Sequence, residues 1–132
     1  MNFQYTSSTH NSIIRFNLSG DLLDKEHSAD LIDELVEKIG HNNIYFILDL
    51  EQMNYLNSTG LNVLITMLTK VRNAGGELVI CNVPKKIDQL LLITKLNTVF
   101  SVAVSFQDAV ELLHKLQDEN ISETISDQDN ES

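Results

Sequence analysis

The sequence has 132 residues, enough for one domain whose single core needs neither a disulfide nor a metal. Its formal net charge of −10, with only nine Lys and Arg, argues against nucleic acid, because phosphate backbones are bound by clustered basic side chains. The apolar runs are too short to span a bilayer, and the N-terminus lacks the basic and apolar segments of a signal peptide. A lone cysteine, Cys81, cannot form an internal disulfide, so a cytoplasmic location is expected. The short apolar runs predict that no membrane is among the partners.

The first part of the chain predicts a hairpin followed by a helix. Residues 2–7 are weakly strand-like, 12–18 are a clearer strand, and a turn is expected at Asn11 between them. Gly20 permits the positive φ of a tight turn and is expected to end the second strand. A helix is predicted from 26 to 39, with its acidic side chains as a solvated face rather than a metal or acid–base site.

The rest of the chain alternates between predicted strands and helices. The nearly apolar run 44–50 predicts a central strand covered on both faces. After the next helix, a strand is expected at 77–82, with Cys81 as a buried, unreactive thiol. Pro84 opens a short helix, 99–104 is a further strand candidate, and Phe106 leads into a final helix. The acidic stretch 119–132 is expected to be a disordered tail after a domain of residues 1–118.

The best functional clue is the helix start that follows the central strand. Asn57 can cap this helix, which leaves Ser58 and Thr59 in its first turn, where the positive end of the helix dipole tolerates a phosphate. Hydroxyl-rich helix starts are common, so spacing alone favours an ordinary helix start. Further along, Val63 points away from the main apolar stripe and Met67 lies at its flank. An exposed pair of this kind is a candidate partner contact, although scattered apolar residues on a surface are ordinary.

Motifs of catalysis are missing from the sequence. The four histidines are widely separated, and no metal-ligand spacing, nucleophile elbow, phosphate loop or dinucleotide fingerprint is present. Ser58 has no base nearby in the sequence to activate it. We therefore expect a binding protein without catalytic residues, cofactor or metal, and keep a small nucleotide-binding enzyme only as a minor alternative.

The residues around this helix start resemble a known family. Leu48-Asp49-Leu50, followed by residues 55–61 (YLNSTGL), is similar to the signature of STAS domains, the module of sulfate transporters and anti-sigma factor antagonists. Segments 18–22, 75–82 and 90–96 support the resemblance, which extends from Ser12 to Leu116. It implies a single α/β domain with a four- or five-stranded mixed sheet and helices mainly on one face.

The resemblance also implies a switch. Ser58, with Thr59 as the fallback, would be phosphorylated by an anti-sigma factor that is a serine kinase using ATP. The unphosphorylated protein would sequester this kinase and free a sigma factor for transcription, and the phosphorylated protein would release the kinase until a phosphatase resets it. The expected docking residues are Asp21, Asn57, Ser58, Thr59, Gly60, Val63 and Met67, on a monomer or weak dimer.

One position departs from the family pattern. Asn57 stands where the family usually has Asp, so the helix cap is kept but the carboxylate charge is lost. If the kinase or phosphatase recognises that charge, the switch is weakened. The alternative is therefore a non-switching STAS-like structural subunit that docks on a transporter ATPase.

Overall fold

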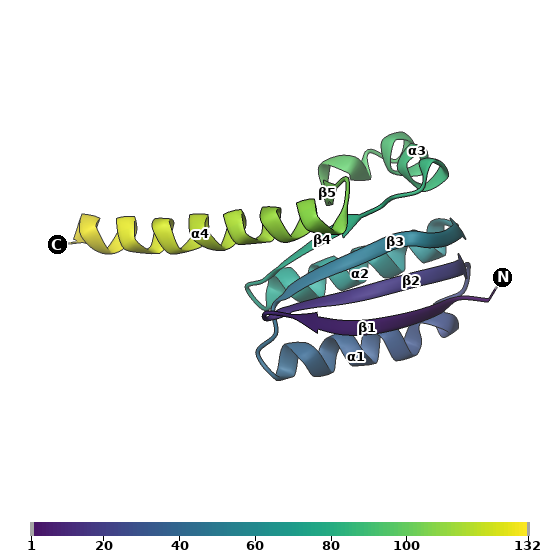
Figure 1. The fold of residues 1–132 in the computed structure, drawn as a ribbon, viewed down its shortest axis with the longest axis horizontal. Coiled ribbons are helices and arrows are strands. Elements are labelled where there is room, and N and C mark those ends of the chain that lie inside the picture. The colour runs from purple at the N-terminus through teal and green to yellow at the C-terminus, as the bar shows by residue number, and fades with distance from the viewer. Residues whose placement is uncertain (1, 132) are drawn as a thin grey trace.

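The computed structural model describes residues 2–131 and, from 119 onward, only the course of the backbone. A five-stranded sheet has the order β1-β2-β3-β4-β5, with β1 antiparallel to β2 and the other neighbours parallel (Figure 1). The strands are β1 (Gln4–His10), β2 (Ile13–Leu22), β3 (Tyr45–Leu56), β4 (Glu77–Cys81) and β5 (Ser101–Ala103). The helices are α1 (Ala29–Gly40), α2 (Ser58–Asn73), α3 (Lys85–Ile93) and α4 (Phe106–Glu131), with short 3-10 helices η1 (Lys25–Ser28) and η2 (Leu96–Thr98).

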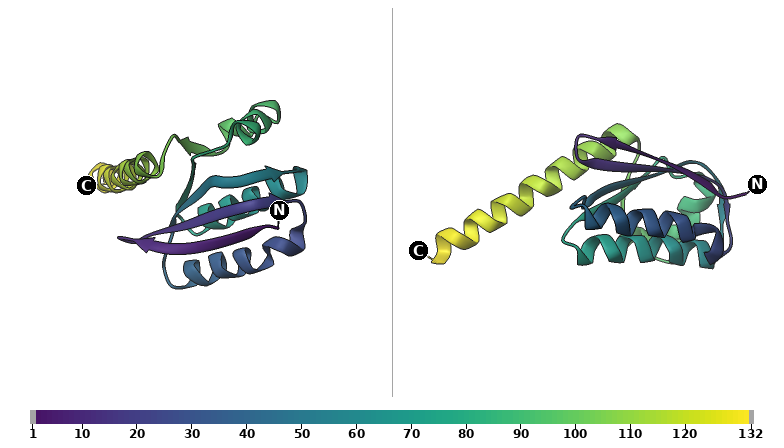
Figure 2. Two further views of the ribbon diagram at one scale, coloured as in Figure 1. Left: turned by 45° about the vertical axis from the view of Figure 1, so that its right-hand side comes forward. Right: turned by 90° about the horizontal axis from the view of Figure 1, so that it is seen from below.

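The two faces of the sheet are covered unequally. The larger core lies between the sheet and α1, α2 and α3, and includes Phe16, Phe46 and Leu64, all fully buried. The smaller core lies under α4 on the opposite face, where Ile47 and Val79 pack against Leu113. Figure 2 shows α1 and α2 side by side under the sheet and α4 extending away from it. The predicted mixed sheet with helices mainly on one face is confirmed.

Strand β2 is longer than the sequence indicated. The hairpin of β1 and β2 forms as predicted, with its turn at Asn11 and Ser12 (φ 48° and 77°). Gly20 does have a positive φ, 83°, but it lies inside β2 instead of ending it. The register against β3 shifts between Gly20 and Asp21, and the strand continues to Leu22. The glycine therefore permits a bulge, and not the predicted turn.

An ion pair between β2 and β3 also contacts the start of α4. Asp49, only 3% exposed, accepts from Arg15 Nη2 at 2.5 Å and from Asn82 Nδ2 at 3.1 and 3.2 Å. The Arg15 guanidinium also lies over the ring of Phe106, with Cζ 4.0 Å from the ring centroid. Phe106 is the first residue of α4, so this contact fixes where the helix leaves the sheet.

Two further predictions concern the C-terminal half. Cys81 is buried as predicted, and this burial, reinforced by the charge of Asp49, raises the pKa of its thiol to about 12. The structure continues α4 as helix to Glu131, whereas the composition predicted a disordered tail over 119–132. Because the side chains of 119–132 lie outside the described residues, the boundary at 118 and the disorder beyond it stay predictions.

Candidate functional site

The candidate site is built around the capping residue of α2, at the end of β2 and β3. Asn57 has an extended backbone, and its Oδ1 accepts a hydrogen bond from the Gly60 N–H at 3.0 Å. Its Nδ2 donates to the Leu23 carbonyl at 3.2 Å, and its backbone N–H to the Leu22 carbonyl at 3.4 Å. The predicted cap is confirmed. The amide additionally ties the start of α2 to the segment after β2, which a carboxylate could not do.

Gly60 is the point of closest approach in this region. A Cβ at this position would lie 2.2 Å from the Leu22 carbonyl oxygen and 2.9 Å from Leu56 Cβ. The residue is buried, so it positions the helix start instead of offering a contact surface. Its role among the predicted docking residues is therefore indirect: the missing side chain allows α2 to begin directly against β2.

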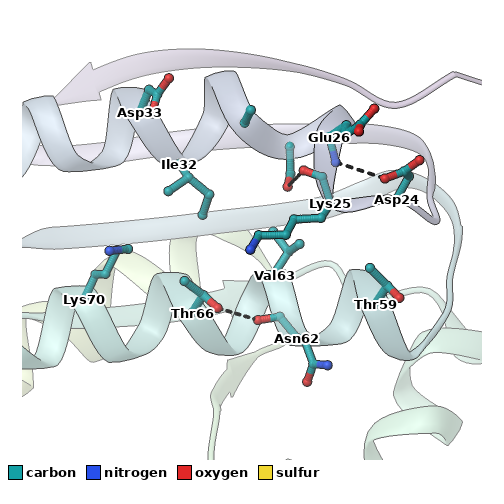
Figure 3. Close-up of a pocket in the computed structure, with 12 residues that line it drawn as sticks. Asp24, Lys25, Glu26, Ile32, Asp33, Thr59, Asn62, Val63, Thr66 and Lys70 are labelled. Atoms are coloured by element: carbon teal, nitrogen blue, oxygen red, sulfur yellow. Dashed lines mark hydrogen bonds between the residues drawn. The ribbon is translucent and has the colours of Figure 1, made fainter.

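The two hydroxyl residues of the first turn are both exposed, but they face different surroundings. Thr59 lines a groove of about 910 Å³ between η1–α1 and α2, whereas Ser58 is not among the residues that line it. Lys25 reaches from η1 into this groove over Val63, and Lys70 lies further along α2 (Figure 3). Acidic side chains also line the groove, namely Asp24, Glu26 and Asp33. The groove therefore has mixed charge, and Ser58 lies outside it, open to solvent.

Asp21 lies at the same end of the sheet. It pairs in register with Tyr55 of β3, one residue before the Leu22–Leu56 pair. Its carboxylate accepts a hydrogen bond from Asn54 Nδ2 at 2.9 Å. The structure thus brings Asp21 to the strand ends that carry Asn57, where it links β2 to β3.

The expected exposure of Val63 and Met67 is wrong. Val63 is 5% exposed and Met67 is fully buried, and both belong to the larger core. The reason is that α2 packs against α1 as well as against the sheet, so a second strip of its surface is covered. Neither side chain is available to a docking partner.

Two exposed apolar side chains at the site were not singled out from the sequence. Leu23, directly after β2, is 44% exposed, and Tyr55, near the end of β3, is 48% exposed. The first supplies the carbonyl that binds Asn57, and the second precedes Asn57 by two positions. Large apolar residues beside a predicted helix cap were the available signal. Such residues are typical anchors of protein interfaces.

The buried carboxylate of Asp49 has structural partners. The Asp49 carboxylate, besides Arg15 and Asn82, accepts from the Glu51 N–H at 3.1 Å, so it stabilises the sheet and is closed to a substrate. Within the part of the chain that the structure describes, no three His, Cys, Asp or Glu side chains are grouped to hold a metal. Among those residues there is also no helix with the length and apolar character needed to cross a bilayer.

Comparisons with known proteins agree on one family. Residues 4–109, from β1 into α4, match the family model of the STAS domain. The anti-sigma F factor antagonist of Paenibacillus polymyxa is 25% identical over 121 residues, which cover 89% of this chain and 97% of the relative.

Solved structures share the fold at low sequence identity. An anti-sigma factor antagonist from Mycobacterium paratuberculosis superposes with a TM-score of 0.71 at 17% identity, covering 85% of this chain and 94% of that one. The anti-sigma factor antagonist SpoIIAA in its unphosphorylated form superposes with a TM-score of 0.63 at 11% identity, covering 87% of this chain and 97% of that one. The phosphorylated form of SpoIIAA from Bacillus also has a TM-score of 0.63, at 14% identity, covering 83% of this chain and 96% of that one.

Proposed function

The chain belongs to the STAS domain family, and we propose that it is an anti-sigma factor antagonist controlled by phosphorylation of Ser58. In the unphosphorylated state it binds an anti-sigma factor that is a serine kinase, and in the phosphorylated state it releases this kinase. The relatives named as anti-sigma factor antagonists, which include a phosphorylated form, support the proposal. The observation that carries it is the exposed Ser58 hydroxyl at the capped start of α2.

The start of α2 can accept a phosphoryl group without refolding. Ser58 is the first residue of the helix, where backbone N–H groups have no acceptor within the helix. The first turn contains no acidic side chain, so the positive end of the dipole is not already neutralised. A phosphoserine with a charge of about −1.5 to −2 is therefore stabilised there.

Release of the partner follows from the position of Ser58. Leu23, whose carbonyl accepts from the Asn57 amide, and Tyr55, two residues before Asn57, are exposed and suited to be anchors of an interface that includes Ser58. Burying an unpaired phosphate charge in such an interface would cost about 3–5 kcal/mol. This lowers the affinity at least about 100-fold, since each 1.4 kcal/mol is a factor of about ten.

Asn57 has a role in the fold that is compatible with switching. Its amide supplies both the cap for Gly60 and the donor for the Leu23 carbonyl. The absence of the family's usual Asp is thus compensated by a second hydrogen bond at the same site. In this proposal the kinase recognises the exposed Ser58 and its flanks without needing a carboxylate at position 57.

The test is phosphorylation by the anti-sigma factor kinase of the same organism with ATP, read by intact-mass and peptide mass spectrometry. Wild type and Thr59→Ala should gain one phosphate, and Ser58→Ala none. Binding of the kinase to Ser58→Glu should be at least about 100-fold weaker than to Ser58→Ala. Modification of Ser58→Ala to the wild-type extent would refute the assignment of the site.

The same variants separate the proposal from the alternative, a permanent subunit of a transporter ATPase. Such a subunit would co-purify with an ATPase, and its binding would be nearly unchanged by Ser58→Glu. That pair of results would reject the switch and retain the family.

A further inference from the structure

We propose that the outer edge of β1 pairs with β1 of a second copy, which joins the two sheets into one continuous sheet. Among the residues that the structure describes, β1 is the first strand in the sheet order, and β2 pairs with one side of it (Figure 1). It has seven residues, whereas β5 at the opposite edge has three. An unpaired edge of this length offers a row of backbone donors and acceptors to another strand.

The composition of β1 leaves this edge unprotected. Its sequence, QYTSSTH, contains no Lys, Arg, Asp, Glu or Pro, the residues that natural proteins place on edge strands to prevent pairing. The chain as a whole has a net charge of −10, which repels a second copy over most of its surface. The strand itself adds no charge to the seam, but Asp30, Asp33 and Glu34 of α1 lie near Tyr5. A second copy fits this edge if it brings a basic side chain opposite these acids.

A two-fold axis through the middle of β1 gives a self-complementary register. Antiparallel pairing about an axis perpendicular to the sheet places opposite each other only residues that point to the same face. With the axis at Ser7, this residue faces Ser7 of the second copy, and Thr6 faces Ser8. Only small hydroxyl side chains meet at the centre, and no like charges are opposed.

Helix α1 provides charge complementarity beside the same seam. The Tyr5 hydroxyl donates to Glu34 Oε1 at 3.1 Å, so this flank of α1 lies next to β1. Lys38 follows Glu34 by one turn and lies on the same flank. Helix α1 returns from the end of β2 to the start of β3, so it runs in the direction of β1.

The position of the two-fold axis brings Glu34 and Lys38 of different copies together across the seam. Ser7 lies about 7 Å beyond Tyr5 along the strand, at about 3.4 Å per residue. The Tyr5 hydroxyl also donates to the Asp30 carbonyl at 3.2 Å, so it lies level with the middle of the stretch from Asp30 to Glu34, near residue 32. The same distance of about 7 Å is about four to five residues along a helix at about 1.5 Å per residue, so the axis passes near Val36. Glu34 of one copy then faces Lys38 of the other, and the reverse pair forms by symmetry.

The seam is separate from the proposed switch. Ser7 pairs in register with Phe16, whereas the site lies at the Leu22 end of β2, about 20 Å further along the strand. Ser58 stays exposed in both copies. The dimer therefore does not depend on the proposed function, and either proposal can fail alone.

Sedimentation equilibrium of the full chain tests the seam at physiological salt, from about 1 µM to 1 mM, where a small interface is expected to dissociate. The average mass should rise from that of one chain towards that of two. Ser7→Lys opposes two ammonium groups at the axis and should raise the dissociation constant at least about tenfold. Asn62→Lys, the same charge change on exposed α2, should leave it within about threefold.

A charge swap on α1 tests the geometry independently of the strand. Glu34→Lys and Lys38→Glu should each weaken the dimer by bringing like charges together, and the double variant should restore it to within about threefold of wild type. Thermal melts of all variants check folding. Two results overturn the proposal: a single-chain mass at every concentration, or a dimer that none of these substitutions weakens. If Ser7→Lys does not fold, the dissociation constants of Glu34→Lys, Lys38→Glu and the double variant decide between the two outcomes.

Discussion

Replacing Asn57 with alanine should destabilise the domain by roughly 2 kcal/mol, because its side chain makes two hydrogen bonds that alanine cannot make. Losing the cap on the Gly60 N–H accounts for about 1 kcal/mol, with a range of about 0.5–2. Losing the bond from Nδ2 to the Leu23 carbonyl accounts for about 1 kcal/mol more. For 132 residues, the entropy of unfolding converts each kcal/mol into about 3.6 °C, so the melting temperature should fall by roughly 7 °C.

Asn57→Asp separates the two hydrogen bonds. A carboxylate still accepts from the Gly60 N–H and gains about 0.3–1 kcal/mol from the helix dipole. It cannot donate to the Leu23 carbonyl, 3.2 Å from the present Nδ2, and its second oxygen would instead face that carbonyl oxygen. The aspartate variant should therefore lie between wild type and Asn57→Ala, about 0–1 kcal/mol below wild type.

Urea unfolding followed by far-UV circular dichroism at neutral pH measures these differences. Asn62→Ala, an exposed position of the same helix, is the matched control and should be neutral or slightly stabilising, because alanine has the higher helix propensity. A loss below about 0.5 kcal/mol in Asn57→Ala would refute the importance of both bonds. If Asn57→Ala and Asn57→Asp lose the same free energy of unfolding, the side-chain oxygen that accepts from the Gly60 N–H contributes nothing, and the role of the cap is refuted.

Two pairs of substitutions and the chemistry of Cys81 test the packing. Gly60→Ala should cost about 2 kcal/mol or more in urea unfolding, because its Cβ would meet the Leu22 carbonyl at 2.2 Å, whereas Gly40→Ala, with open space, should be neutral or stabilising. Cys81, with its thiol pKa raised by burial to about 12, should react with a disulfide reagent at least about 100-fold more slowly in the native than in the urea-unfolded protein; equal rates would contradict its burial. Because the folded pKa is the higher one, the thiol adds stability below its unfolded pKa, near 9, and this is lost as the pH rises towards 12. Asp49→Ala should cost roughly 2–3 kcal/mol, since it leaves the Arg15 guanidinium, 25% exposed, without its partner. Glu77→Ala, which breaks the more exposed pair with Arg72, should cost less than about 1 kcal/mol.

The periodicity of the sequence was sufficient for the order of the elements and for the two covered faces of the central strand. Residues 44–50 predict a strand covered on both sides, and in β3 Phe46 and Ile47 do point into different cores. Gly20 shows what this reasoning misses. A positive φ was foreseen there, but whether it ends a strand or bulges it depends on the neighbouring strand β3, which pairs with β2 on both sides of the glycine.

The candidate site was foreseen where it depends on local chemistry and missed where it depends on packing. The cap by Asn57 follows from residue type and position, and the structure confirms it. The burial of Val63 and Met67 depends on α1, whose placement beside α2 is set by the sheet and not by either helix alone. The donor role of the Asn57 amide needs the Leu23 carbonyl, which approaches only because β2 extends past its bulge.

The order of the sheet has a consequence for how the domain forms during synthesis. Each strand pairs with the strand that precedes it in the chain, so no segment waits for a distant partner and loop closure is cheap at every step. The elements that shape the helix start at Asn57 are β2, β3 and α2, which all leave the ribosome before β4, β5 and α4. The region that carries Ser58 can thus assemble first, and the C-terminal elements dock onto an already formed β1–β2–β3 sheet.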